Sequence, residues 1–219
     1  MTGQFQLPPA FDLAAVFLFA LTGAWVAIQR SYDLVGVFTL ALATGLGGGL
    51  LRDVVFIQHE HPAVIEDARY LWVVLAATFL AALTFPLARH FKQPVAAVDA
   101  LALGVYAVVG AQKALATGLS PTDAVFVGVI NATGGGLIRD VLVREEPLFL
   151  KPGQYYVLAA LGGTSLFTLL ITYGQTPVQA AAWLSIGATF LLRMLAIQFN
   201  WHTSPMPRWG EKDAPADDD

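Results

Sequence analysis

Residues 44–53 read TGLGGGLLRD, and residues 131–140 read NATGGGLIRD. Each copy contains three consecutive glycines, then two apolar residues and an Arg-Asp pair, and long apolar runs flank both copies. A glycine costs a helix about 1 kcal/mol relative to alanine, and a charged side chain is costly in hydrocarbon. A motif that combines both features and occurs twice therefore needs a structural or functional reason.

The composition indicates an integral membrane protein. Of 219 residues, 56% are hydrophobic and only 13% are charged, whereas about a quarter of the residues in soluble domains are charged. The chain has no cysteine, which excludes disulfides and thiolate metal sites. The acidic, proline-containing segment 200–219 is expected to be a flexible cytoplasmic tail. Neither nucleic-acid binding nor a cleavable signal peptide is indicated.

Seven apolar segments are long enough to cross a hydrocarbon core of about 30 Å as helices. Turn and capping residues such as Lys92-Gln93-Pro94 and Ser120-Pro121 separate them. We therefore predict an all-α integral membrane protein with seven transmembrane helices. The predicted spans are 12–30, 34–56, 70–88, 98–118, 121–143, 155–173 and 178–197.

The basic residues predict the orientation, because cytoplasmic loops are enriched in lysine and arginine. With the N-terminus outside, only Arg69 lies in an outer loop. Eight basic residues then lie on the inner side, at Arg30, Arg89, Lys92, Arg144, Lys151, Arg193, Arg208 and Lys212. We therefore expect a multi-pass protein of the cell inner membrane, with its N-terminus outside and its C-terminus in the cytoplasm.

The two motifs align at an offset of 87 residues, and the same offset places Asp12 on Asp99 and Gly23 on Gly110. This predicts a three-helix repeat at 12–88, a second at 98–173, and an additional seventh helix at 178–197. Three spans is an odd number, so the second unit must be inverted in the membrane. Many transport proteins have this inverted architecture, and their substrate path lies between the repeats.

The glycine triplets allow two interpretations. They could kink helices two and five and expose carbonyl groups along an aqueous path, because irregular backbone within a membrane must face protein or water. Alternatively, small residues could simply let the helices pack closely. The symmetric repetition favours the path. The residues predicted to kink the helices or line this path are Gly47, Gly48, Gly49, Gly134, Gly135, Gly136, Thr44 and Asn131.

Four charged residues follow the glycines: Arg52, Asp53, Arg139 and Asp140. Because adjacent residues on a helix do not face each other, each arginine is expected to find a carboxylate elsewhere. The predicted topology brings Asp12 to Arg52 and Asp99 to Arg139. In the alternative interpretation, the two partner aspartates are helix N-caps and the arginines extend to the membrane surface.

Lys113 is a further cation within a predicted span, and it either gates or tunes the path or extends to the outer surface. Asp123 is expected to cap a helix. His59 and His61 lie in a predicted outer loop and are expected to be solvated rather than to bind a metal. No arrangement of nucleophile and base suggests an enzyme.

Residues 12–197 have seven predicted spans in a 3+3+1 plan, with the GGGxxRD motif in both repeats. In these features the chain resembles the prokaryotic members of the trimeric intracellular cation (TRIC) channel family. Sequences of that family also carry a glycine transporter domain label. The resemblance implies a homotrimer in the lipid bilayer, with a potassium-permeable pore inside each protomer and no cofactor.

The residues alone leave the charge of the permeant species open. Carbonyl groups favour cations, whereas unpaired arginines favour anions. Two functions therefore remain. One is a channel for monovalent cations, chiefly potassium. The other is a secondary transporter of a small zwitterion such as glycine, in which an arginine and an aspartate would bind the carboxylate and the ammonium group.

Overall fold

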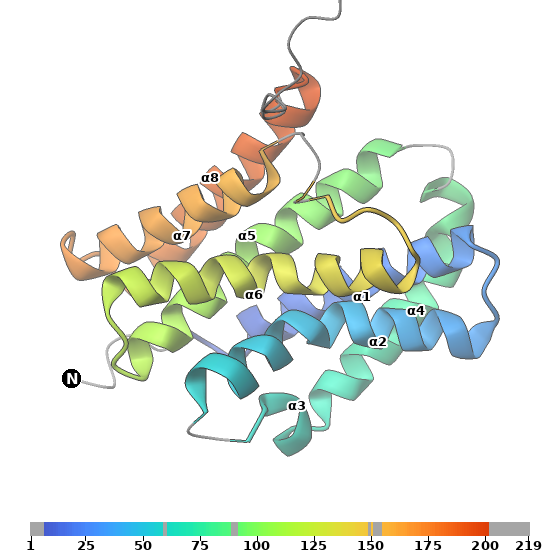
Figure 1. Ribbon diagram of the computed structural model, residues 1–219, viewed down its shortest axis with the longest axis horizontal. Coiled ribbons are helices and arrows are strands. Elements are labelled where there is room, and N and C mark those ends of the chain that lie inside the picture. Colours follow the sequence, from blue (N-terminus) through green and yellow to red (C-terminus); the bar gives the residue numbers. More distant parts are fainter. Residues whose placement is uncertain (1–6, 59–60, 89–91, 149, 151–154, 202–219) are drawn as a thin grey trace, which may run out of the picture.

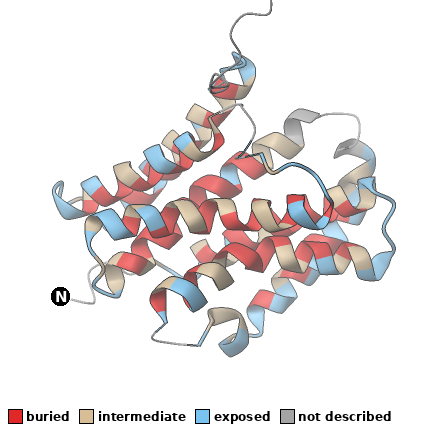
Figure 2. Cartoon of the chain, in the orientation of Figure 1, coloured by how far each residue is buried: buried red, intermediate tan, exposed pale blue. Residues whose placement is uncertain are grey.

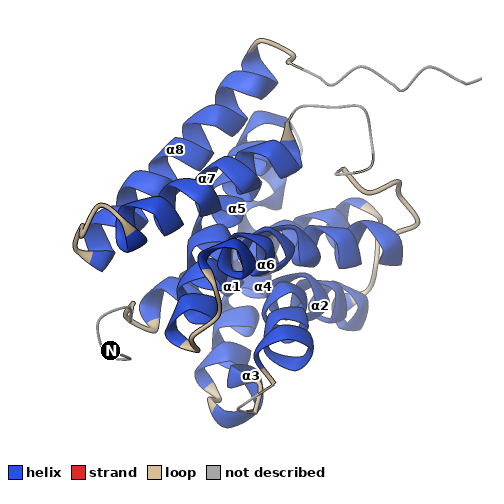
Figure 3. Cartoon of the chain, turned by 60° about the vertical axis from the view of Figure 1, so that its left-hand side comes forward, coloured by secondary structure: helices blue, strands red, loops and turns tan. Residues whose placement is uncertain are grey.

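A computed structural model describes residues 7–58, 61–88, 92–148, 150 and 155–201, and every regular element among them is a helix (Figures 1 and 3). Most of the segment 200–219, predicted to be a tail, lies outside these residues. The elements are α1 Ala10–Gln29, α2 Leu34–Leu51, the π-helix η1 Arg52–Ile57, α3 Ala63–Glu66, α4 Arg69–Ala88, α5 Lys92–Ala116, α6 Pro121–Leu142, α7 Tyr156–Thr172 and α8 Val178–Gln198.

Seven apolar helical segments follow the order of the predicted spans. Six are long and apolar enough to cross a membrane: α1, α2 together with η1, α4, α5, α6 and α8. The remaining one, α7, is apolar and has 17 residues, which corresponds to about 26 Å of helix. The four-residue α3 lies between the second and third segments. The prediction of an all-helical membrane protein is therefore confirmed.

Local capping explains where two of these helices begin. The carboxylate of Asp33 accepts a hydrogen bond of 2.8 Å from the backbone N–H of Gly36 at the start of α2. At the start of α6, Ser120 and Asp123 form a reciprocal capping box, and Pro121 occupies the first turn. Both arrangements satisfy backbone donors that an uncapped helix would leave free, and the predicted capping role of Asp123 is confirmed.

Asp12 and Asp99, by contrast, do not cap helices. The N-cap of α1 is Pro9, which makes no side-chain capping bond. Asp99 lies inside α5, which begins seven residues earlier at Lys92 rather than near residue 98. Both carboxylates are buried. The N-cap interpretation is therefore wrong for both residues, and each must be stabilised by other groups.

The helices pack as two groups of three and one additional helix. α1, α2 and α4 contact one another, as do α5, α6 and α7, while α8 packs on α5 and α7. The two groups meet where α1 contacts α5 and where α2 contacts α6. Figure 1 shows α2 and α6 side by side. Buried residues concentrate along these central helices (Figure 2).

The glycine triplets lie where α2 crosses α6. A Cβ added at Gly48 would meet the carbonyl oxygen of Asn131, and one added at Gly135 would meet that of Thr44. These two contacts are equivalent under the repeat. Only residues without a side chain permit such a close approach between helix backbones.

The triplets do not interrupt the α-helical hydrogen-bonding pattern. α2 and α6 continue as α-helices through their glycines, and the backbone of α2 leaves the α-helical pattern only after Leu51, where η1 begins. The first two glycines of each triplet act in close packing, because a Cβ at Gly47 or Gly134 would clash with a side chain of the opposite helix.

The outer surface of α4 is strongly apolar. Its exposed large hydrophobic side chains are Leu71, Trp72, Leu75, Phe79, Leu80 and Leu83. A contiguous apolar helix face of this kind is unfavourable in water, and it suits contact with lipid or with another subunit.

Candidate functional site

The end of the bundle where α1 begins and α2 ends holds a cluster of buried charged groups, the first charged cluster, formed by Asp12, Arg52, Asp53, Tyr70 and Lys113. Arg52 is only 1% exposed. Its Nη2 lies 3.5 Å from Asp12 Oδ2, as the predicted pairing requires. Its Nε also lies 2.6 Å from Oδ1 of the adjacent Asp53.

Asp12 is the centre of this cluster. Its Oδ2 accepts hydrogen bonds from Lys113 Nζ at 2.7 Å and from the Tyr70 hydroxyl at 2.9 Å. These two partners and Arg52 come from α5, α4 and η1, so one carboxylate on α1 joins four helices. Lys113, which is partly exposed, binds a buried carboxylate.

Arg52 also reaches the second group of helices. Its Nη1 lies 3.4 Å from Asn131 Oδ1 on α6, and the Asn131 amide donates a 2.7 Å hydrogen bond to the Tyr106 carbonyl on α5. The Tyr106 hydroxyl donates to the carbonyl oxygen of Gly45 on α2, and its ring stacks on Phe19 with centroids 5.3 Å apart. Polar contacts therefore cross the centre of the bundle.

A second charged cluster lies at the opposite end, around Arg139. The Arg139 Nη1 lies 3.1 Å from Asp99 Oδ1 and 3.3 Å from the hydroxyl of Thr22, and its Nε lies 2.9 Å from Asp140 Oδ1. The pairing of Asp99 with Arg139 agrees with the prediction. Because these residues are the repeat equivalents of Asp12, Arg52 and Asp53, the two clusters have the same core.

The expectation that adjacent Arg and Asp residues do not interact is wrong in both clusters. Adjacent side chains on a helix point away from each other and, when short, do not make contact. The arginine side chain is long enough for its guanidinium group to reach the carboxylate of the next residue. Each arginine therefore binds two carboxylates, one adjacent and one on another helix.

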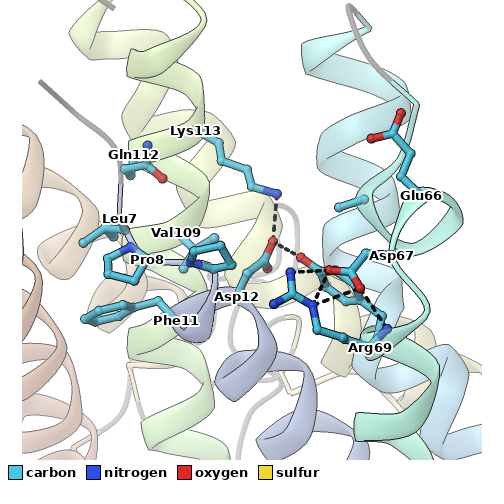
Figure 4. Close-up of a pocket in the computed structure, with 13 residues that line it drawn as sticks. Leu7, Pro8, Phe11, Asp12, Glu66, Asp67, Arg69, Val109, Gln112 and Lys113 are labelled. Carbon is cyan, nitrogen blue, oxygen red and sulfur yellow. Dashed lines mark hydrogen bonds and ion pairs between the residues drawn. The ribbon is translucent and has the colours of Figure 1, made fainter. Parts of the chain in front are cut away.

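A cavity of about 280 Å³ opens beside the first charged cluster (Figure 4). Asp12, Gln112 and Lys113 line it on one side, and the ion pair between Asp67 and Arg69 lines it on another. Hydrogen bonds from Arg69 lower the pKa of Asp67. Three carboxylates and two basic groups line this wide cavity: Asp12, Glu66, Asp67, Arg69 and Lys113.

A second, much smaller cavity adjoins the first at Asp12 and Tyr70. It has a volume of about 10 Å³, and its lining includes Gly49, Arg52 and Tyr106. A cavity of that size holds at most one water molecule. The two cavities share Asp12, Ala63 and Tyr70 as lining residues, and Arg52 lines only the smaller one.

The third glycine of each triplet differs from the first two, because it faces charged and hydroxyl groups. A Cβ at Gly49 would lie 3.6 Å from Arg52 Nη2 and 3.8 Å from the Tyr106 hydroxyl. A Cβ at Gly136 would lie 3.2 Å from the Tyr156 hydroxyl and 3.9 Å from Arg139 Nη2.

Three buried groups at these sites were not predicted from the sequence. Tyr70 and Tyr106 occur in apolar runs where an aromatic residue is typical of a core. Arg193 was counted as a basic residue at the inner end of its helix, but it is 4% exposed and lies over the ring of Tyr156 at 5.0 Å. Its position inside the apolar 178–197 segment, four residues before the end, is the signal that indicates burial.

Comparison with known proteins agrees with this architecture. A family model described as "Glycine transporter" matches residues 9–86 and again residues 96–172. The inner membrane protein YadS of Escherichia coli, a UPF0126 protein, is 32% identical over 192 residues, which cover 87% of this chain and 91% of YadS.

Two solved structures have the same fold. A trimeric intracellular cation channel orthologue from Rhodobacter sphaeroides is 34% identical, with a TM-score of 0.77 over 87% of this chain and 96% of its own. Another TRIC cation channel is 30% identical, with a TM-score of 0.76 over 95% of this chain and all of its own. The chain therefore belongs to the UPF0126 membrane protein family, the prokaryotic TRIC family that its sequence resembles.

Proposed function

We propose that the protein is a cation channel whose path lies within a single chain, between the two groups of three helices. The observation that carries this proposal is the pair of equivalent charged clusters at opposite ends of the bundle, joined by the crossing of α2 and α6. The likeness to solved TRIC cation channels supports it.

The charges of the clusters favour a cation as the permeant species. Arg52 and Arg139 each bind two carboxylates, so neither presents an uncompensated positive charge to the path. The wide cavity has one more carboxylate than basic groups along its lining, and a cavity lined by an excess of one sign concentrates counter-ions. We propose potassium as the principal permeant ion.

The conformation described here corresponds to a closed path. The narrow cavity holds at most one water molecule, and Asp12, which lines it, is bound by both Arg52 and Lys113. Opening then requires these side chains to separate, with Gly49 leaving room for an ion to pass Arg52 and Tyr106.

The bilayer arrangement completes the proposal. We infer that residues 12–88 and 98–173 are inverted repeats, because one family model matches both parts of the chain and because the clusters are equivalent. The distribution of basic residues supports an N-terminus outside and a C-terminus in the cytoplasm. The trimeric structural relative supports a homotrimer, and the apolar face of α4 suits contact with lipid or another subunit.

A carrier for a small zwitterion is the second candidate, and the description of the matching family model favours it. The wide cavity offers Lys113 for a carboxylate and Glu66 for an ammonium group.

Reconstitution distinguishes the two functions. The purified protein is placed in planar bilayers with potassium as the sole cation, and in liposomes for uptake of labelled glycine. A channel gives unitary potassium currents and no saturable uptake. Saturable glycine uptake without unitary currents would contradict the channel proposal.

A further inference from the structure

The aspartate of each Arg-Asp motif accepts a hydrogen bond from a backbone N–H further along the chain. Asp53 Oδ2 accepts a 3.3 Å hydrogen bond from the backbone N–H of Ala63, ten residues further along. Asp140 Oδ2 accepts a 3.2 Å hydrogen bond from the backbone N–H of Leu148, eight residues further along. In both copies, one carboxylate therefore joins the arginine to the segment that follows the glycine helix.

At the first cluster, the segment held in this way is part of the wall of the path. Residues 62–67, which we call the α3 segment, contribute Ala63 and Val64 to the narrow cavity. Ala63 also lines the wide cavity, together with Glu66 and Asp67. The α3 segment therefore lies along both cavities where they meet.

The α3 segment is only partly buried. None of the four residues of α3 has a buried side chain, although Ala63 and Val64 pack against the core as partly buried residues. Segments with little buried apolar surface open at low free-energy cost. The C-terminal end of the α3 segment is fixed by Asp67, whose carboxylate accepts hydrogen bonds of 2.9 Å and 2.7 Å from the Arg69 backbone N–H and Nε at the start of α4. Asp53 holds its N-terminal end.

We propose that the α3 segment is a lid over the narrow cavity, held closed by Asp53, and that Asp53 couples this lid to Arg52. The inference rests on the proposed path. Arg52 binds Asp53 at both carboxylate oxygens, at 2.6 Å and 3.1 Å, and the same guanidinium group binds Asp12. Movement of Arg52 away from Asp12 therefore also disturbs the bond that holds the lid. Asp53 also lines the narrow cavity, and its role in the lid is that of a positioning residue.

One substitution removes the proposed bond without changing either charged residue. Ala63→Pro deletes the donating N–H and nothing else of the cluster. Proline is well tolerated at the first position of a helix, which Ala63 occupies, and the preceding Pro62 already has the extended backbone (φ −53°, ψ 132°) that a following proline requires.

The test uses the absence of native cysteine from the chain. Leu50, which lines the narrow cavity, is replaced by cysteine, and intact mass gives its rate of reaction with a cationic methanethiosulfonate in the purified, nanodisc-embedded protein. In this background, Ala63→Pro and Asp53→Ala are each expected to raise the rate about tenfold, the effect of losing one hydrogen bond to a charged group. The double variant is expected to react no faster than Asp53→Ala alone, because Asp53→Ala already removes the bond that Ala63→Pro removes.

Two controls make the result specific. Asp140→Ala, the equivalent change at the opposite cluster, is expected to leave the Leu50→Cys rate unchanged. Glu146→Cys, at an exposed position, gives the rate for an open site. The lid proposal would be contradicted if Ala63→Pro changed the labelling rate of Leu50→Cys by less than twofold. It would also be contradicted if Leu50→Cys alone reacted as fast as Glu146→Cys. Labelling is measured without currents, so this test can fail while the protein still conducts, and the reverse also holds.

Discussion

Lys113 Nζ lies 2.7 Å from Asp12 Oδ2, closer than Arg52, whose Nη2 lies 3.5 Å from the same oxygen. The cation nearest to the Asp12 carboxylate is therefore Lys113, from the second group of helices, and not Arg52, whose pairing with Asp12 is repeated by Arg139 and Asp99. The side chain of Lys113 is also 29% exposed, whereas that of Arg52 is 1% exposed. Lys113 is therefore the partner that can leave Asp12 at the lower desolvation cost.

Lys113→Gln is expected to raise the potassium current. The change removes a positive charge from the wide cavity and frees Asp12 to attract a permeant cation. A partly exposed ion pair contributes about 1 kcal/mol, which corresponds to about a fivefold change in open probability or conductance in single-channel recordings. Arg30→Gln is the control, because Arg30 pairs with Glu145 at an exposed position outside the cavities. A reduced current in Lys113→Gln would contradict this role.

Loss of Arg139 is expected to destabilise the fold strongly. Arg139→Met leaves Asp99 and Asp140 buried without their cation, and breaking a buried pair on one side costs about 3–5 kcal/mol. Adding Asp99→Asn removes one of the two stranded charges and is expected to restore part of that loss. The melting temperature of the detergent-solubilised protein measures both effects. If the double variant melts no higher than the single one, the pairing is not energetically important.

The glycines of one triplet are expected to differ in their tolerance of alanine. Gly48→Ala places a methyl group against the Asn131 carbonyl oxygen, and overpacking of this kind costs about 1–3 kcal/mol. At Gly49 the nearest atoms lie at ordinary contact distance, so Gly49→Ala is expected to be neutral or slightly stabilising in a melting experiment, because alanine favours the helix. Equal destabilisation by the two changes would exclude the crossing as the reason for the motif.

The Asp67–Arg69 pair is expected to contribute stability that depends on pH. Arg69 lowers the pKa of Asp67 below its ordinary value of 3.8. The contribution is therefore complete above that value and is lost as the pH falls through the lower pKa of the folded state. The difference in melting temperature between the parent and Asp67→Asn should shrink below about pH 4. A difference that is constant with pH would show that the carboxylate charge has no role.

The inverted repeat explains what the sequence could predict. Once the spans and their directions are assigned, Asp12 and Arg52 must lie at one end, and Asp99 and Arg139 at the other. Long-range pairing then follows from topology, and the structure contains both pairs. The seven apolar segments are equally predictable, because the hydrocarbon core of a bilayer sets their length and composition.

Features outside the repeat were less predictable. Lys113 corresponds to Val26 in the first unit, so symmetry gave it no partner. The three glycines of a triplet look alike in the sequence but have two roles. Gly48 packs against α6, whereas Gly49 faces the charged cluster, and this difference depends on the position of the neighbouring helices. The π-helix at Arg52–Ile57 depends on how the following segment returns to the bundle, which apolar periodicity does not encode.

We propose that ions pass through the interior of each chain along the narrow cavity. The potassium current of Leu50→Cys after complete reaction with a cationic thiol reagent tests this path, with labelling verified by intact mass. Glu146→Cys, at an exposed position, is the control. We predict that labelling at Leu50 abolishes the current while the labelled Glu146→Cys protein conducts as before, and a fully labelled Leu50→Cys protein that conducts unchanged would contradict this path.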